Sequence, residues 1–377
     1  MSNTTISVQV VGIGGGGGNA VDHIARAHRG NNVTYAAINT DVQALNALQI
    51  AQKIQIGAQL TGGHGSGARP EIGRQAAEED YPRLRELFQA SHLVFLAAGL
   101  GGGTGTGATP VVAKAAKERG ALTIAVVTRP FAFEGARRAE IAEQGLIELR
   151  HAVDTIICIP NDRVIKLADE NIGIEAAFRM TDEVLRQAVD AVSELVARVG
   201  IINIDYGDIA TVLREPGDAM VGFGEAAGEN HATKAARYAL TSPLLERNNI
   251  AGAKQVLISI AAGRDLKMRD VQEAIQCVHN EVRGNAHVIF GVTLHEDMSN
   301  MARVTLIATG LPDAAAVEHG RPRPVVPAAF KPLQTTMDFM PAETGRFSGL
   351  EPTLLSGVNY DTPTFMRWGR KLLSDAA

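Results

Sequence analysis

The sequence predicts an α/β protein with a Rossmann-like parallel sheet, and three observations carry that prediction. Short apolar runs, such as 93–98 and 122–127, alternate with segments of helical periodicity. Glycine-rich loops directly follow two of the apolar runs, at 6–11 and 93–98. With 377 residues the chain exceeds one ordinary domain, so two are expected. Because the loops after successive parallel strands gather at one edge of a sheet, a ligand is expected at that edge.

Composition and charge exclude several classes of protein. The net charge is −5 with acids and bases interspersed, which leaves no basic stripe for nucleic acid. Cys158 and Cys277 lie far apart and are expected to be reduced thiols of a cytoplasmic protein. We expect no direct membrane insertion, because no signal peptide precedes the first strand and no apolar run approaches bilayer length. The ten histidines form no zinc-ligand cluster, and the sequence does not identify metal ligands.

The loop at 101–107, GGGTGTG, is the strongest candidate for an anion site. It lies between a predicted strand at 93–98 and a predicted helix at 110–117. Glycines let a ligand approach the backbone, and the free N–H groups at a helix start favour negative charge. The Thr104 and Thr106 hydroxyls could bind phosphate oxygens or a metal ion. The loop lacks the Gly-Lys-Ser/Thr ending of a Walker A loop, so backbone N–H groups and a cation must neutralise the phosphates.

A second glycine run, at 12–18, follows the strand at 6–11 and precedes a helix that is predicted to begin near Ala20. In isolation, Gly12, Gly14 and Gly17 could form a dinucleotide fingerprint, with Asp41 after the next strand as the acid that binds the ribose. An NAD-dependent oxidoreductase is therefore one alternative function. The five consecutive glycines before Asn19 and the second loop at 101–107 fit it poorly.

These motifs together resemble a known family. The spelling GGGTGTG, the glycine run before Asn19 and the triplet at 39–41, Asn-Thr-Asp, are similar to the FtsZ branch of the tubulin family, GTPases of the bacterial cell-division ring. The resemblance runs from about residue 8 to 310. It implies GTP and GDP as ligands with Mg²⁺, head-to-tail self-assembly, and a cytoplasmic location at the mid-cell division ring beneath the inner membrane.

The resemblance also carries over the nucleotide-binding residues. Glu134 and Arg138 match the family's ribose and phosphate contacts, and Asn161 lies in its nucleotide pocket. The full set implied is Gly15, Gly16, Gly17, Gly18, Asn19, Gly102, Gly103, Thr104, Gly105, Thr106, Gly107, Glu134, Arg138, Asn161, Phe178 and Asp182.

The loop at 62–71 departs from the family, because Arg69 replaces an asparagine. Arg69 could add a cation near the triphosphate, or it could face solvent. Together with an altered C-terminal motif, it keeps open a second alternative function, a non-hydrolysing paralogue that binds GTP and modulates filaments. Light scattering that depends on nucleotide, combined with phosphate release, separates this alternative and the oxidoreductase from a polymerising GTPase.

A single long helix is predicted over 174–199, with Phe178 and Asp182 on one face. The resemblance implies that Phe178 stacks on the base and that Asp182 reads it. A carboxylate can accept both N1–H and N2–H of guanine, whereas adenine offers no such pair. Without the resemblance, Asp182 would be an ordinary exposed helix acid.

The loop after this helix contains Asn203, Asp205 and Asp208, the predicted catalytic residues. Two acids three residues apart are commonly helix caps. The resemblance implies instead that the loop is half of an active site, which one subunit presents to the nucleotide of the next. A helix over 174–199 is about 39 Å long at 1.5 Å per residue, so these acids should not reach the phosphates of their own subunit.

We divide the chain into a GTP-binding domain (1–173), a central helix (174–200), a smaller α+β domain (201–312), a disordered linker (313–357) and a tail peptide (358–377). The linker is rich in proline and lacks periodicity. Residues 359–371 resemble the family's peptide for membrane-tethering and regulatory division proteins. Thr362, Met366 and the Trp368-Gly369 pair depart from the usual spelling, which leaves the identity of those partners open.

Overall fold

The computed structural model describes most of residues 6–311, with gaps at 28–32, 167–171, 198–199, 203, 215–217, 246–249 and 283–285. These residues belong to one compact unit. In a second unit, Leu354–Leu355 (β11) pairs antiparallel with Val358–Asn359 (β12). The remainder of the predicted linker and tail lies outside the described residues.

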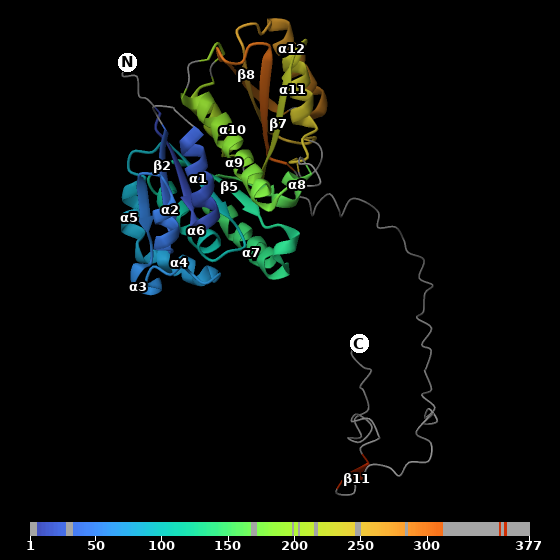
Figure 1. The fold of residues 1–377 in the computed structure, drawn as a ribbon. Helices are drawn as coiled ribbons and strands as arrows, with labels where there is room; N and C mark the ends of the chain where they lie inside the picture. Colours follow the sequence, from blue (N-terminus) through green and yellow to red (C-terminus); the bar gives the residue numbers. More distant parts are fainter. Residues whose placement is uncertain are drawn as a thin grey trace, which may run out of the picture. The chain divides into compact units, whose positions relative to one another are not determined.

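In the described part of the chain, ten strands form one sheet in the order β3-β2-β1-β4-β5-β6-β7-β10-β8-β9 (Figure 1). Its N-terminal strands are all parallel. They are β1 (Val8–Ile13), β2 (Val33–Asn39), β3 (Gln52–Gln55), β4 (Leu93–Gly99), β5 (Leu122–Arg129) and β6 (Thr155–Pro160). Strands β1, β4 and β5 are buried almost throughout, because helices cover both faces. The predicted α/β fold class is confirmed.

Two sets of helices cover this parallel part. One face packs against α1 (Gly14–Ala27), α2 (Val42–Ala47) and the long α9 (Ile174–Ala197). The other face packs against α4 (Pro70–Glu79), α5 (Tyr81–Leu87), α6 (Thr104–Lys117) and α7 (Ala136–Ala152). Three short helices complete the loops: α3 (Ala58–Thr61), the 3₁₀ helix η1 (Ala132–Glu134) and α8 (Asn161–Ile165). None of the helices described is long and apolar enough to cross a bilayer.

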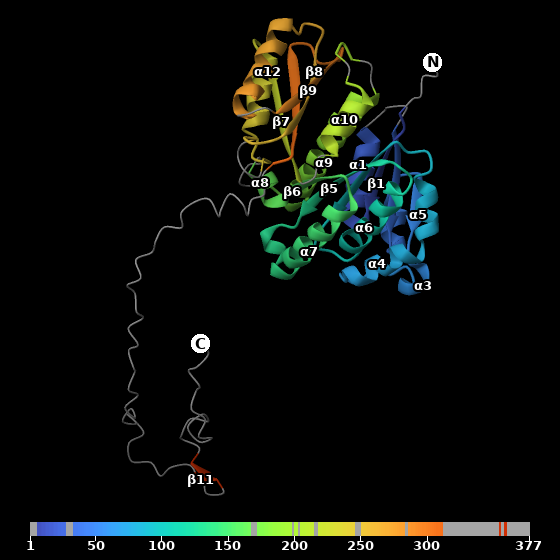
Figure 2. The same ribbon diagram turned by 180° about the vertical axis from the view of Figure 1, so that it is seen from behind.

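The C-terminal part, residues 218–311, continues the same sheet. β7 (Asp218–Ala227) joins β6 through two residue pairs, Ile156 with Asp218 and Ile157 with Ala219. Beyond it lie β10 (Met301–Thr309) and β8 (Gln255–Ala262), both in antiparallel pairing, and then β9 (His287–Leu294), which is parallel to β8. α11 (His231–Leu240) and α12 (Met268–Val282) contribute to a third core. α10 (Tyr206–Leu213) follows α9 along the chain (Figure 2).

Both glycine loops differ from their predicted form, because the helices begin inside them. α1 starts at Gly14 instead of near Ala20, and α6 starts at Thr104, so Pro110 lies within a helix. Close backbone packing explains why glycine is used despite its low helix propensity. A Cβ on Gly17 would lie 2.1 Å from the Ala97 carbonyl oxygen, and one on Gly107 would lie 1.9 Å from that of Pro70.

Candidate functional site

The two glycine loops meet at the carboxyl edge of the parallel sheet. A Cβ on Gly14, whose φ is +74°, would lie 2.8 Å from the Gly105 nitrogen, so the starts of α1 and α6 touch. Gly15 and Gly102 differ from their neighbours, since no other atom lies within 4 Å of where their Cβ would be. Backbone N–H groups in the first turn of a helix have no intrahelical partner. This edge therefore offers two helix starts with open space over the backbone, as a phosphate site requires.

The predicted glycines thus fall into two groups. Gly15, Gly16 and Gly102 leave room for a ligand, because at most distant backbone atoms of Gly99 approach them. Four others pack so closely against neighbouring segments that a side chain would clash, namely Gly17, Gly103, Gly105 and Gly107. Gly18 is less restricted, because only the Leu48 side chain, at 3.2 Å, approaches its Cβ position. Asn19 is exposed on α1.

The threonine hydroxyls of the loop are hydrogen-bonded within the protein. Thr104 Oγ1 lies 2.6 Å from Thr40 Oγ1 and 3.0 Å from Ser66 Oγ, and all three residues are buried. Thr106 Oγ1 accepts a hydrogen bond of 2.9 Å from the Gly101 N–H. Thr104 therefore connects the glycine loop at 101–107, the candidate phosphate loop, to two other loops. One follows β2 and the other precedes α4. Neither Thr40 nor Ser66 is among the predicted site residues, although the triplet at 39–41 and the glycine loop at 62–71 contain them.

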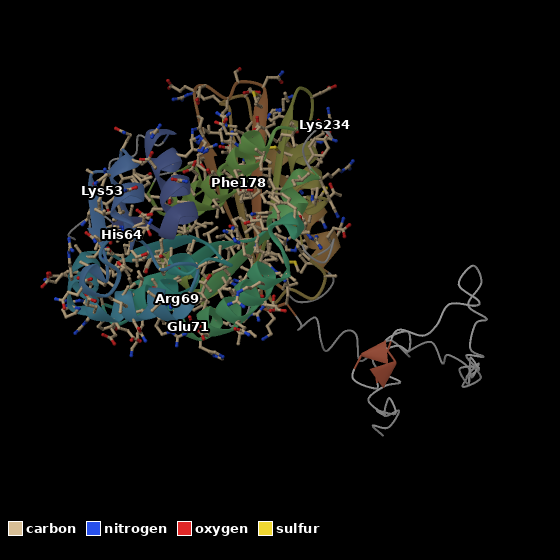
Figure 3. The ribbon with its side chains drawn as sticks, turned by 60° about the horizontal axis from the view of Figure 1, so that its bottom comes forward. Lys53, His64, Arg69, Glu71, Phe178 and Lys234 are labelled. Carbon is tan, nitrogen blue, oxygen red and sulfur yellow. The ribbon has the colours of Figure 1, made fainter. Side chains whose placement is uncertain are left out.

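Arg69 lies beside the phosphate loop with its side chain exposed, as Figure 3 shows for the Arg69–Glu71 segment. The backbone nitrogen and oxygen of Arg69 lie 2.7 and 2.9 Å from where a Gly103 Cβ would be. Its side chain lines a surface pocket of about 490 Å³ together with Arg74, Arg137 and Thr106. The backbone of this loop thus packs against the glycine loop at 101–107, while the arginine side chain is exposed.

Aromatic side chains and an unpaired carboxyl lie at the start of α9. Phe178 is 43% exposed and packs edge-to-face on the buried Phe131, with ring centroids 5.2 Å apart. Phe131 in turn stacks on Phe133 at 5.0 Å. One turn beyond Phe178, burial raises the pKa of Asp182 to about 7. A partly buried carboxyl that no described cation stabilises is suited to a ligand that brings hydrogen-bond donors.

Asn161 is a buried polar residue in the first turn of α8. It is only 5% exposed, and its Oδ1 has no hydrogen-bond partner among the residues that the structure describes. A buried acceptor without a partner costs about 1 to 3 kcal/mol, so such groups usually mark a bound molecule or water. Nearby, Glu134 accepts a 2.9 Å hydrogen bond from the Phe131 N–H and pairs with Arg138, whose side chain is 54% exposed.

The predicted catalytic acids lie at the opposite edge of the sheet. Asp205 caps α10 by accepting a 2.7 Å hydrogen bond from the Asp208 N–H, and both residues are exposed. Between them, the Tyr206 hydroxyl donates to the His92 carbonyl at 2.7 Å. Asn203 lies outside the described residues.

The length of β4 gives the separation between the acids and the glycine loop at 101–107. His92 immediately precedes this strand, and the phosphate loop immediately follows it. Seven residues of strand span about 23 Å, and the 24 residues of α9 span about 36 Å. α10 and α4 accordingly lie at opposite ends of this part of the molecule (Figure 1). The acids and the phosphate edge therefore do not form one site within a subunit.

Among the described residues, no group of three or more His, Cys, Asp or Glu side chains could hold a metal ion. Mg²⁺ commonly keeps several waters and binds through substrate phosphates with few protein ligands. An Mg²⁺ ion that is carried mainly by nucleotide phosphates would need no such group of protein ligands.

A parallel sheet whose first and fourth strands each end in a glycine-rich helix start defines a nucleotide-binding α/β protein. Comparison with known families specifies which one. Residues 7–169 match the GTPase domain of the tubulin/FtsZ family, and residues 217–312 match the C-terminal domain of the FtsZ family. The chain belongs to the FtsZ family of cell-division proteins, with a tubulin-like GTPase domain.

Individual relatives agree with this assignment. The cell division protein FtsZ of Buchnera aphidicola subsp. Schizaphis graminum is 48% identical over 311 residues, which are 82% of this chain and 80% of that protein. FtsZ 1 of Rhizobium meliloti is 42% identical over 345 residues, which are 92% of this chain and 58% of its own. An empty FtsZ dimer from M. jannaschii superposes with a TM-score of 0.77 at 39% identity, covering 82% of this chain and 89% of that one. CetZ2 from Haloferax volcanii, at 22% identity and a TM-score of 0.73, covers 83% of this chain and 96% of its own and shares the fold.

Proposed function

We propose that this chain is a filament-forming GTPase that hydrolyses GTP at the contact between successive subunits and scaffolds the division ring. The separation of the acids from the phosphate edge is the observation that carries the proposal. If Asp205 and Asp208 act on a γ-phosphate, it must belong to a neighbour. Such a head-to-tail contact is heterologous and does not close, so it generates a filament. The M. jannaschii relative whose structure is titled a dimer supports self-association.

The residues of one subunit would bind and orient the nucleotide. Phe178 stacks on the base, and the Asp182 carboxylate accepts the two N–H groups of guanine. Glu134 ends η1 and Arg138 lies in the first turn of α7, and both would contact the ribose and phosphates. The first turns of α1 and α6 would hold the phosphates. Mg²⁺ would supply neutralisation of phosphate charge, held mainly by the phosphates themselves.

The next subunit would supply the acids, and their different hydrogen bonding supports different tasks for them. The Asp205 carboxylate already accepts the Asp208 N–H, so it fixes the shape of the loop. The Asp208 carboxylate has no hydrogen-bond partner among the described residues and is exposed. Asp208 is therefore the better group to orient the attacking water and accept its proton, while Asn203 lies two residues before Asp205 in the same loop.

Mixing two defective variants tests the shared site. Asp208→Ala should bind GTP and assemble, yet release phosphate slowly. Asp182→Ala should bind GTP poorly and show a narrower preference over ATP, because two charge-assisted hydrogen bonds are worth about 1.5 to 3 kcal/mol each. The mixture should recover activity, since one variant supplies the nucleotide and the other supplies the acid loop. Wild-type GTPase activity per subunit should also rise steeply above a threshold concentration. Hydrolysis proportional to protein concentration down to isolated monomers would contradict the shared site.

Residues 359–371 would recruit membrane-tethering and regulatory division proteins, which places the filament at the mid-cell ring on the cytoplasmic side of the inner membrane. The motif follows the segment 313–357, which is rich in proline and lies mostly outside the described residues.

A further inference from the structure

Two of three consecutive residues of the short helix α8 form hydrogen bonds to other parts of the protein, and the third is a predicted nucleotide-binding residue. Asn161 is buried with an unpartnered Oδ1, as described above. Asp162 accepts a hydrogen bond of 3.1 Å from the Ala132 N–H of η1. Arg163 donates from Nη1 to the carbonyl oxygens of Pro243 at 3.2 Å and Leu245 at 2.7 Å, in the C-terminal part. The helix itself is five residues long and is anchored by the buried Val164.

The turn that Arg163 contacts lies between two hydrophobic cores. Leu244 is buried in the core shared by α9 and the parallel strands, whereas Leu245 is buried in the core beneath α11. The turn is closed by a hydrogen bond of 3.1 Å from the Leu245 N–H to the Ser242 carbonyl. A displacement of this turn must therefore disturb both cores, and Arg163 is positioned to hold it in place.

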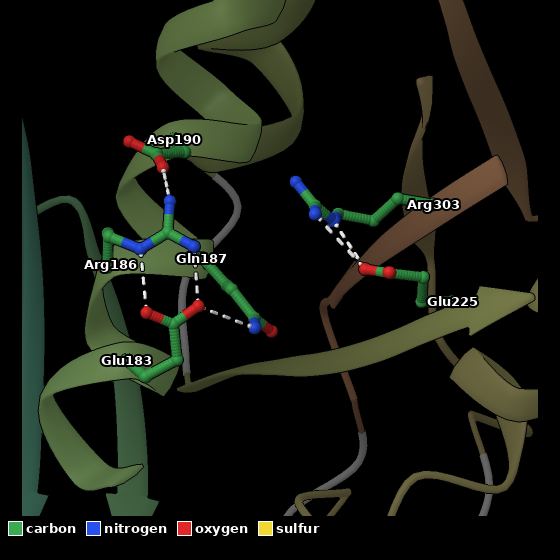
Figure 4. Close-up of polar contacts among 6 residues, drawn as sticks. All are labelled: Glu183, Arg186, Gln187, Asp190, Glu225 and Arg303. Atoms are coloured by element: carbon green, nitrogen blue, oxygen red, sulfur yellow. Dashed lines mark hydrogen bonds and ion pairs between the residues drawn. The ribbon is translucent and has the colours of Figure 1, made fainter. Parts of the chain in front are cut away.

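Several ion pairs of other arginines lie within one part of the protein. Arg186 pairs with Glu183 and Asp190 on its own helix, α9, and Arg303 pairs with Glu225 across β10 and β7 (Figure 4). The Arg163 contacts differ because they cross from α8 to the C-terminal part. The Arg150–Asp218 pair also reaches the C-terminal part, because its two hydrogen bonds of 2.8 and 2.6 Å join α7 to the first residue of β7.

We propose that Arg163 is a positioning residue through which an occupied nucleotide pocket stabilises the turn at 242–245. A nucleotide that donates a hydrogen bond to Asn161 Oδ1 removes the cost of its unpaired acceptor and holds α8 in place. Arg163 lies two residues further along the same short helix, so the geometry of its bonds to the turn is held as well. The coupling rests on guanine nucleotide binding in the proposed pocket. It requires neither assembly nor hydrolysis.

Hydrogen–deuterium exchange of the full chain with and without GDP tests the coupling, at protein concentrations where light scattering detects no assembly. In the wild-type chain, GDP should slow exchange in the peptide covering Thr241–Leu245 by about fivefold or more, the usual lower end of coupling between two sites. Arg163→Met should lose most of that protection while binding GDP with unchanged affinity. Arg163→Lys should retain part of it, because an ammonium still donates to the carbonyls.

Arg150→Met is the matched control. It also removes an arginine that joins the two parts, but Arg150 lies about 18 Å along α7 from Arg138 by helical rise. In Arg150→Met, GDP should protect the peptide Thr241–Leu245 as much as it does in the wild type. Thermal unfolding measures any general loss of stability in each variant. Equal protection in Arg163→Met and the wild type, or no protection by bound GDP in the wild type, would overturn the proposal. Failure of the wild type to bind GDP at all would overturn the proposed pocket as well, and calorimetry identifies that case.

Discussion

Nucleotide affinity should depend on pH through Asp182. Burial raises the pKa of this carboxyl to about 7 in the nucleotide-free protein. Two N–H donors from guanine favour its ionised form, so its pKa falls on binding and a proton is released. Affinity should therefore rise as pH increases toward 7 and level off above it. At pH 6 only about one carboxyl in ten is ionised, which raises the Kd about tenfold over its value at pH 8, equivalent to about 1.4 kcal/mol.

Titration calorimetry with GDP between pH 6 and 8.5, in buffers of different ionisation enthalpy, measures both the Kd and the proton release. The terminal phosphate of GDP also titrates near about pH 6, so the informative quantity is the difference between the wild type and Asp182→Asn. Glu183→Gln is the control on the same helix. Burial opposes ionisation of Glu183, but hydrogen bonds from Arg186 and Gln187 outweigh it and lower its pKa, so this variant should retain the wild-type profile. Parallel profiles for the wild type and Asp182→Asn would refute the assignment of Asp182.

Three further outcomes are expected. Gly17→Ala should prevent normal folding, because its Cβ would lie 2.1 Å from the Ala97 oxygen. Gly15→Ala should fold normally and weaken GDP binding, and circular dichroism and nucleotide titration compare the two variants. Asp182→Asn should raise the free energy of unfolding of the nucleotide-free protein at pH 8 by up to about 4 kcal/mol, measured by urea unfolding. Folding raises the pKa of the Asp182 carboxyl from 3.8 to about 7, so the ionised carboxyl destabilises the folded protein. The gain should disappear near pH 4, where the carboxyl is mostly protonated in both states. Removal of residues 358–377 should leave GTP-dependent assembly intact and abolish recruitment to membranes coated with division partners, whereas loss of assembly would make the tail part of the fold.

The sequence predicted the strand and helix alternation well because periodicity and burial on both faces leave a direct pattern. It failed at the helix starts. Glycine has low helix propensity, so residues 12–18 and 101–107 were expected to be turns, yet in both segments a helix begins. The competing effect is tertiary packing, since the Gly17 and Gly107 positions have no space for any side chain. Such contacts join segments far apart in the sequence, and no local pattern reports them.

The residue types of the site could be predicted from the sequence, but the hydrogen bonds that join the site to distant segments could not. Asp182 and Asn161 were selected only through the family resemblance, and the structure adds the raised pKa of one and the unpartnered acceptor of the other. Ser66 and Arg163 went unnoticed, because a hydroxyl in a glycine loop and an arginine in a short helix carry no periodic signal. Their partners lie 38 and about 80 residues away in the chain, which only the folded protein reveals.

The arrangement along β4, with the phosphate loop at one end and the Tyr206 contact at the other, makes the two ends of a proposed filament chemically unequal. One terminal subunit would expose a nucleotide with no acids beside it, and the other would expose acids with no substrate. A filament would therefore contain one fewer complete hydrolytic site than it has subunits, so the shortest oligomers would turn over least GTP per molecule. The terminal nucleotide would also outlast those inside, and each filament would keep an unhydrolysed cap at only one end.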